Sequence, residues 1–316
     1  MAGQGARLTP PSDPDPDPDA GAPHASGRMD RVDERAVEAD LVAELVTIAE
    51  QLAREAGRMV HEGRPDRVEV AATKSSAVDV VTAMDLASEE LLRRRLAELR
   101  PRDGILGEEQ GFVPGTSGVT WVVDPIDGTV NYLYGIPSYA VSVAAVVGPV
   151  GDDGRAPDPA TWTVLAGCVH APSDGRTFTA GRGTGARLDG RGLSIGEERP
   201  LNGCLVGTGF GYLASRRRSQ ARVLVELLPR VRDIRRNGSA AIELCTLAFG
   251  GLDLFYERGL APWDLAAAGL VAQEAGALVT GLHGRRAGVE MVVAGHPSQV
   301  AELVAVLEEI RADSDM

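Results

Sequence analysis

Two carboxylates stand where an apolar run of the chain stops. In WVVDPIDGTVNYLYGIP, residues 121–137, the run ends on Asp124, and Asp127 follows one turn later. Pro125 has a fixed φ and Gly128 permits a close approach of the backbone, so the two carboxylates can point at one place. Crowded carboxylates repel one another unless a cation neutralises them, and oxygen ligands without His or Cys suit Mg²⁺, Mn²⁺ or Ca²⁺ better than Zn²⁺. The pattern predicts a metal-dependent phosphoryl reaction, in which two metal ions could hold the attacking water and the leaving oxygen.

Other acids stand at the ends of expected elements. Glu108 and Glu109 end a short strand, Asp264 begins a helix, and Asp79 and Asp85 precede an earlier helix. Taken one at a time, such acids are usually solvated or cap a helix. We therefore expect Asp85 and Asp264 to be N-caps, and we expect a site only if these acids come together.

Several stretches of this sequence resemble, in order, the inositol monophosphatase family. The three strongest are GEE (107–109), DPIDGTVNY (124–132) and PWDLAAAGLVAQEAGA (262–277). Supporting stretches are TKSSAVDVVTAMD (73–85), GRGTGARLDGRGLSI (181–195) and GSAAIELCTLAFGGLDLFYERG (238–259). The resemblance, which spans roughly 35–310, implies an α/β (α+β) fold in alternating α-β-α-β-α layers, of the inositol monophosphatase and fructose-1,6-bisphosphatase type. It also implies a Mg²⁺-dependent, lithium-sensitive phosphomonoesterase that forms a homodimer.

The resemblance further implies a set of metal ligands. Glu108, Asp124 and the main-chain carbonyl of Ile126 would bind the first Mg²⁺. Asp124, Asp127 and Asp264 would bind the second, so that Asp124 bridges the two. Glu108 would also help to hold a weaker third ion, which gives two or three Mg²⁺ per site.

The same resemblance assigns roles beside the ligands. Thr129, paired with Asp85, would orient the attacking water, so Glu108, Thr129 and Asp85 are the expected catalytic residues. A metal-bound water has a lowered pKa and can attack in line without a protein nucleophile. Three residues would support the ligands from outside: Lys74, Asp79 and Glu109.

The residues expected to contact the substrate are small residues and acids. Backbone amides at Gly128 and Thr129 would hold the phosphate. The alcohol would face Ser239 and Ala240, which leave room for a polyol ring, and Glu257, which could accept hydrogen bonds from its hydroxyls. The full set is Asp127, Gly128, Thr129, Ser239, Ala240, Glu257 and Asp264.

Two features of this half of the site keep alternatives open. Glu257, taken alone, is a surface acid at a strand end. The run Arg216-Arg217-Arg218 either lines the site entrance and meets an anionic substrate or is the solvated start of a helix.

Alternating helices and strands must position these residues. Apolar residues recur at helical spacing from about 33 to 62, and strands and helices then follow in mixed order, which indicates a layered architecture. We expect an Asp/Pro-rich disordered tail over 1–30, an N-terminal α+β half over 31–148 that carries most metal ligands, and a C-terminal α/β half over 149–316 that completes the site. The loop 148–160 either marks that boundary or interrupts a continuous sheet.

Composition restricts the partners. The chain has 316 residues and a formal net charge of −13, which argues against binding to nucleic acid or to an anionic membrane. Three distant cysteines, Cys168, Cys204 and Cys245, are typical of buried free thiols in a reducing compartment. We expect a cytoplasmic protein whose partner is a small-molecule phosphate monoester.

Several functions compete. The first expectation is hydrolysis of myo-inositol 1-phosphate. Rival substrates on the same fold are histidinol phosphate, fructose 1,6-bisphosphate and 3′-phosphoadenosine phosphate. A rival of another class is a non-catalytic scaffold for protein or RNA machinery, against which the complete set of acids argues.

Overall fold

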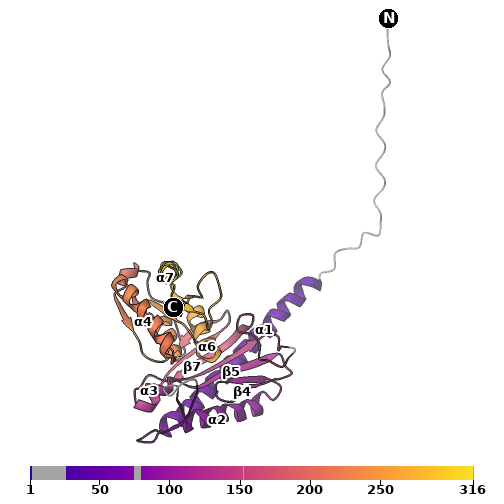
Figure 1. The fold of residues 1–316 in the computed structure, drawn as a ribbon. Coiled ribbons are helices and arrows are strands. Elements are labelled where there is room, and N and C mark those ends of the chain that lie inside the picture. The colour runs from indigo at the N-terminus through magenta and orange to yellow at the C-terminus, as the bar shows by residue number, and fades with distance from the viewer. Residues whose placement is uncertain (2–25, 75–79, 152, 316) are drawn as a thin grey trace. The chain divides into compact units, whose positions relative to one another are not determined.

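The computed structural model describes residue 1 and residues 26–74, 80–151 and 153–315, with side chains from residue 38 onward (Figure 1). The chain divides into a unit that ends at Ala39 and a unit from Asp40 to Met316, and all that follows concerns the second unit. Most of the tail expected over 1–30 lies outside the described residues, as does Asp79.

The larger of two main sheets carries Asp124 and Asp127 at the end of one of its strands. Its strands are β3 (Gly104–Gly107), β4 (Gly111–Val113), β5 (Val119–Asp127), β6 (Ala140–Val147), β7 (Thr163–Ala171), β8 (Arg176–Gly181), β9 (Gly185–Leu188) and β10 (Arg191–Gly192). Their order is β10-β9-β8-β7-β6-β5-β3-β4, with β5 parallel to β3 and antiparallel to β6. Because β6 and β7 are neighbours, the loop 148–160 interrupts a continuous sheet, and the chain changes sheet only after β10.

A smaller sheet and a hairpin complete the strands of the described chain. The smaller sheet holds β11 (Leu205–Thr208), β12 (Asp233–Arg235), β13 (Leu254–Glu257), β14 (Leu278–Thr280) and β15 (Val292–Gly295). Its order is β12-β11-β13-β15-β14. The hairpin pairs β1 (Val70–Thr73) with β2 (Val80–Thr82).

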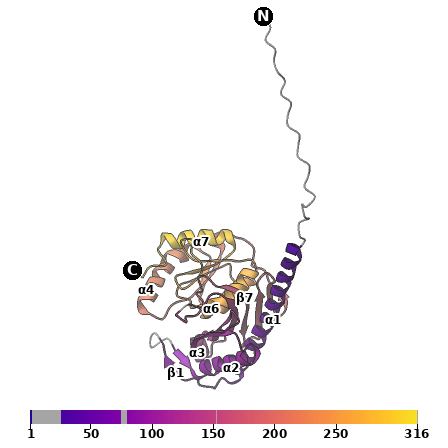
Figure 2. The same cartoon turned by 90° about the vertical axis from the view of Figure 1, so that its right-hand side faces the viewer.

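The helices form three layers around the two sheets. They are α1 (Ser26–Glu62), α2 (Ala83–Leu99), α3 (Thr129–Tyr134), α4 (Ala214–Leu227), α5 (Ala240–Ala248), α6 (Pro262–Glu274) and α7 (Pro297–Glu309), with short 3₁₀ turns at Leu201–Gly203 and Leu228–Arg230. Residues of α1 and α2 share one buried cluster with the larger sheet, α5 and α6 share a second with both sheets, and α4 and α7 share a third with the smaller sheet. Figure 2 shows α6 between the layer of α4 and α7 and that of α2. The expected α-β-α-β-α order is therefore confirmed.

Strand β5 shows how the pattern of side chains builds these layers. All of its residues are buried, as expected for a central strand with helices on both faces. Trp121 and Val123 belong to the cluster of α1 and α2, whereas Val122 belongs to that of α5 and α6. This alternation leaves the end of β5, with Asp124 and Asp127, between the layers.

The helix starts correct two predictions. Ser239 caps α5, because its Oγ accepts a hydrogen bond from the backbone N–H of Ile242 at 3.2 Å. Asp85 and Asp264 are not N-caps; the prediction was wrong because each is the third residue of its helix. Their carboxylates instead reach back to the N–H of Thr82 (2.8 Å) and of Ala261 (2.7 Å). In this position each acid can support its helix with one oxygen and face the site with the other.

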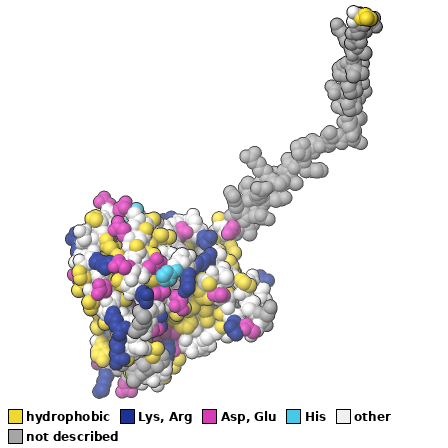
Figure 3. Space-filling model, turned by 45° about the horizontal axis from the view of Figure 1, so that its top comes forward, with side chains coloured by type: hydrophobic (Ala, Val, Ile, Leu, Met, Phe, Trp, Pro, Cys, Tyr) yellow, Lys and Arg dark blue, Asp and Glu magenta, His cyan; other side chains and the backbone are white. Residues whose placement is uncertain are grey.

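The surface of the protein and its cysteines show no further functional feature among the described residues. Figure 3 shows acidic and basic side chains interspersed with apolar ones on one face. In the described part of the chain, no helix combines the length and the apolar character that crossing a bilayer requires. Cys168, Cys204 and Cys245 are buried and free, as expected.

Candidate active site

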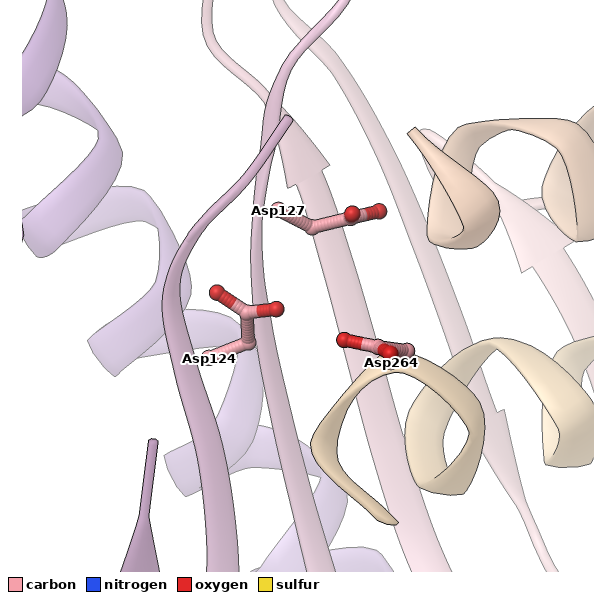
Figure 4. Close-up of side chains that lie close together, drawn as sticks. All are labelled: Asp124, Asp127 and Asp264. Carbon is pink, nitrogen blue, oxygen red and sulfur yellow. The ribbon is translucent and has the colours of Figure 1, made fainter. Parts of the chain in front are cut away.

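Three carboxylates from two elements meet at one point. Asp124 and Asp127 come from the end of β5, and Asp264 comes from the first turn of α6. One oxygen of each lies within 4.8 Å of the others (Figure 4). Asp124 is 1% exposed and Asp127 is 9% exposed. The structure thus brings Asp264 to two acids, Asp124 and Asp127, that are distant from it in the sequence.

Crowding and burial disfavour the charged forms of these acids. Burial, followed by the charges of Glu108, Asp127 and Asp264, raises the pKa of Asp124 well above its ordinary value. Burial and the charge of Asp127 likewise raise the pKa of Asp264. A divalent cation among the oxygens would remove this penalty. The donor set fits a hard cation, because it consists of carboxylates, and Ile126 lines the same cavity.

The N-terminus of α5 holds Asp127 in place. Its Oδ2 accepts hydrogen bonds from Ser239 Oγ at 2.6 Å and from the N–H of Ala241 at 2.7 Å. Burial raises the pKa of Asp127, and these two hydrogen bonds act against that shift. Ser239 therefore has a structural contact with a site acid that the sequence did not predict, in addition to its place in the cavity wall.

Glu108 lies beside the cluster of three aspartates and forms an ion pair with Lys74. Lys74 Nζ lies 2.6 Å from Glu108 Oε1 and 2.7 Å from Glu109 Oε1. Burial raises the pKa of Glu108 to about 7, and the Lys74 cation acts against that rise. Lys74 thus contacts both Glu108 and Glu109, although Glu108 is outside the group of three carboxylates described above.

A residue that the sequence did not reveal shapes the turn of Glu108. The buried carboxylate of Glu89, on α2, accepts hydrogen bonds from the N–H of Glu109 (2.7 Å) and of Gln110 (2.9 Å) and pairs with Arg93 at 2.8 Å. A Cβ at Gly107 would lie 2.3 Å from Glu89 Oε1, so this glycine is required for the approach. In the sequence Glu89 has the form of a surface acid with an i,i+4 arginine, and nothing marks it.

Thr129 and Asp85 meet as the resemblance implied. Thr129 Oγ1 lies 3.1 Å from Asp85 Oδ1 and 3.0 Å from the carbonyl oxygen of Ile126. Asp85 is fully buried and also accepts a hydrogen bond from the Thr82 hydroxyl. Gly128, at φ 97°, precedes Thr129 and has its Cα against the carbonyl of Ser138, where a Cβ would come within 2.8 Å. The hydroxyl is therefore fixed at the edge of the acid cluster.

Most of the predicted site residues line one cavity of about 470 Å³. The predicted residues in its wall are Lys74, Glu108, Asp124, Ile126, Asp127, Gly128, Thr129, Ser239, Ala240, Glu257 and Asp264. Asp85 and Glu109 are not in the wall; Asp85 contacts Thr129, and Glu109 contacts Lys74. Glu257 lies against Gly209, whose Cβ would come within 2.0 Å of the carboxylate, and burial raises its pKa well above the ordinary value.

Sequence reasoning missed three charged residues of this wall. They are Glu243, Arg236 and Arg258. Of the run Arg216-Arg217-Arg218, only Arg216 lines the cavity. The run is also the start of helix α4, so each of the two alternatives holds for part of it. Arg217 instead donates to the carbonyl of Gly211 at 2.8 Å.

Comparisons with known proteins find one family and several relatives that this chain resembles. The model of the inositol monophosphatase family matches residues 41–312. Inositol-1-monophosphatase SuhB of Mycobacterium tuberculosis is 43% identical over 286 residues, which cover 84% of this chain and 94% of that protein. Nus factor SuhB of Pasteurella multocida is 35% identical over 268 residues, with 84% and 94% covered.

Solved structures show the same fold. The structure of Mycobacterium tuberculosis SuhB aligns with a TM-score of 0.70 at 42% identity and covers 86% of this chain and 98% of its own. The Thermotoga maritima IMPase aligns with a TM-score of 0.70 at 28% identity and covers 90% and 98%.

Proposed function

This chain belongs to the inositol monophosphatase family of phosphomonoester hydrolases, and we propose that its substrate is myo-inositol 1-phosphate, hydrolysed with Mg²⁺ to inositol and phosphate. The observation that carries the proposal is the meeting of Asp124, Asp127 and Asp264 at the base of a cavity whose wall includes Thr129. Such a cluster of buried acids is unfavourable on its own and is explained by a cation that binds there together with an anionic substrate.

Each residue has a separate task in this proposal. Asp124, Asp127, Asp264, Glu108 and the carbonyl of Ile126 would hold two or three Mg²⁺. When bound, Mg²⁺ lowers the pKa of water and offsets charge on phosphoryl oxygens.

The remaining contacts control the water and the alcohol. Thr129 Oγ1, oriented by Asp85, would accept or donate the hydrogen bond that fixes the attacking water. Lys74 would keep Glu108 ionised, since the ion pair opposes the effect of burial. The N–H groups after Gly128 would bind the phosphate. Glu257 would accept hydrogen bonds from hydroxyls of the alcohol, and Ser239 and Ala240 would leave room for its ring.

The test is a panel of phosphate monoesters. Purified protein is given inositol 1-phosphate, histidinol phosphate and fructose 1,6-bisphosphate, with Mg²⁺ and with a chelator, and phosphate release is measured. We expect the highest kcat/KM for inositol 1-phosphate and no release with the chelator. Faster turnover of histidinol phosphate would overturn the choice of substrate but not the phosphatase.

A binding role is the second candidate. Some relatives are named Nus factor SuhB, a name that applies to those proteins. A scaffold would have no need of buried acids that oppose folding, and their presence here favours hydrolysis. No phosphate release from the whole panel would favour the binding role, whereas full activity without any effect of Mg²⁺ would contradict only the role given to the metal.

A further inference from the structure

Two arginines of the cavity wall share one carboxylate that lies outside the wall. Arg216, at the start of α4, and Arg258, directly after Glu257 at the end of β13, both line the cavity. Both are ion-paired with Asp315, in the segment that follows α7. Asp315 Oδ1 lies 2.9 Å from Arg216 Nε and 2.7 Å from Arg258 Nη1, and its Oδ2 lies 3.3 Å from Nη2 of each.

The positive charge of Arg216 and Arg258 exceeds the negative charge of Asp315. Among the ion pairs of the described residues, neither Arg216 nor Arg258 has a second acidic partner, so two positive charges face one negative charge. Arg258 is 9% exposed, and its Nε is buried without a hydrogen-bond partner. A buried guanidinium retains a strong demand for anionic acceptors, because its desolvation is compensated only by complete pairing.

Asp315 is a replaceable partner. Its side chain is 45% exposed, whereas that of Arg258 is 9% exposed. Its other contact is a long one, 3.5 Å from Ser219 Oγ. Ion pairs with an exposed member contribute little to stability, so an anion that enters from the cavity can compete with this carboxylate. Paired guanidinium groups are well suited to bind phosphate through two parallel hydrogen bonds.

We propose that Asp315 competes with a second anionic group of the substrate for Arg216 and Arg258, and so sets the preference of the cavity between phosphate monoesters of uncharged alcohols and those whose alcohol carries a further phosphate. While Asp315 holds the two guanidinium groups, an uncharged alcohol is favoured. A substrate with a second phosphate must displace Asp315 to gain these contacts. This inference rests on the proposed phosphatase function, because it concerns the alcohol side of the same cavity.

The test compares two probes that differ by one phosphate, fructose 1-phosphate and fructose 1,6-bisphosphate. The quantity measured is the ratio of kcat/KM for the bisphosphate to that for the monophosphate, with Mg²⁺. In Asp315→Asn we expect this ratio to rise at least about fivefold, since the competitor for charge-assisted hydrogen bonds is lost. In Arg216→Gln we expect the ratio to fall below the wild-type value, and in the double variant Asp315→Asn/Arg258→Gln we expect the gain to disappear.

A matched control is available on α7. Glu309 pairs with Arg230 at 2.9 and 3.1 Å, and neither residue lines the cavity. Glu309→Gln removes an acid of an arginine pair in the same part of the chain and should leave the ratio at the wild-type value.

The outcomes separate the two proposals. An unchanged ratio in a folded Asp315→Asn protein would overturn the inference and leave Asp315 with a structural role only. If Asp315→Asn fails to fold, an unchanged ratio in Arg216→Gln overturns it equally. If no variant releases phosphate, the proposed function fails. Calorimetric titration with the two sugars then still decides, because the inference requires Asp315→Asn to bind the bisphosphate more tightly than the wild type does.

Discussion

Thr129 Oγ1 lies 3.1 Å from Asp85 Oδ1, at the edge of the acid cluster. Two distant segments, the start of α2 and the start of α3, are thereby joined by one hydroxyl, and the buried carboxylate fixes its orientation. The contact supports the proposal that Thr129 positions the attacking water.

Loss of this hydroxyl should therefore reduce kcat. We expect Thr129→Val to lower kcat for inositol 1-phosphate by about 100-fold or more, the typical contribution of positioned proton transfer. Thr129→Ser retains the hydroxyl and should keep most of the activity. Thr47→Val, which removes an exposed hydroxyl on α1, is the control. Wild-type kcat in Thr129→Val would show that the hydroxyl has no part in the reaction.

Glu89 should matter through the turn that it holds. Glu89→Ala leaves the N–H groups of Glu109 and Gln110 without their acceptor, so we expect a loss of roughly 2 kcal/mol in the free energy of unfolding. We also expect a higher Mg²⁺ concentration for half-maximal activity, because Glu108 lies in this turn. Chemical denaturation and Mg²⁺ titration measure the two effects.

The neighbouring acid provides the control for this experiment. Glu90 is exposed on the same helix, and Glu90→Ala should change neither quantity. Equal behaviour of the two variants would contradict the role given to Glu89.

Gly209 should control how Glu257 meets the substrate. A Cβ at residue 209 would lie 2.0 Å from Glu257 Oε1, so Gly209→Ala must displace that carboxylate. We expect KM for inositol 1-phosphate to rise roughly tenfold, as for a lost hydrogen bond to a charged group, with a smaller effect on kcat. Gly192→Ala, where a Cβ would meet nothing within 4 Å, should have wild-type kinetics. A normal KM in Gly209→Ala would remove Glu257 from the substrate contacts.

Glu243 should make stability depend on pH. Its side chain is 1% exposed, and burial raises its pKa to about 8, despite the hydrogen bond from the N–H of Asn237. Because the folded protein holds this proton more tightly than the unfolded chain does, the contribution is complete below the ordinary value of 4.5 and is lost as the pH rises towards 8. Glu243→Gln is neutral at every pH, so its stability relative to the wild type should increase between these two values.

The measurement is thermal or chemical unfolding at several pH values in the presence of a chelator. Each pKa unit corresponds to about 1.4 kcal/mol, which sets an upper limit of several kcal/mol on the gain. Glu302→Gln, at an exposed position of α7, is the control. A difference between Glu243→Gln and the wild type that does not vary with pH would contradict the assignment.

The sequence predicted the part of the site that lies on local turns. Asp124 and Asp127 could be placed together because a proline and a glycine shape the chain beside them, and the family motifs add Glu108, Thr129 and Asp264. The layered fold followed from the alternation of helices and strands together with the resemblance. The positions of Asp85 and Asp264 in their helices were wrong, because an acid at the third position and an acid at the cap are hard to tell apart in a sequence.

The remainder depends on contacts between distant segments. Glu89 looks like a surface acid until α2 packs against the turn at Glu109. Arg258 and Asp315 are separated by 57 residues, and only the packing of the smaller sheet against the segment after α7 brings them together. No local pattern announces such pairs, since their chemistry arises from burial rather than from spacing.

Asp124→Asn tests the central claim most directly. Asp124 is the most buried of the three clustered acids, and the proposal gives it a place between two Mg²⁺. Asp174→Asn, in an exposed pair with Arg176, is the matched control. We predict that Mg²⁺ raises the Tm of the wild type, and that Asp124→Asn folds, lacks this increase and releases no measurable phosphate from inositol 1-phosphate at any Mg²⁺ concentration. Wild-type turnover by Asp124→Asn would contradict the account.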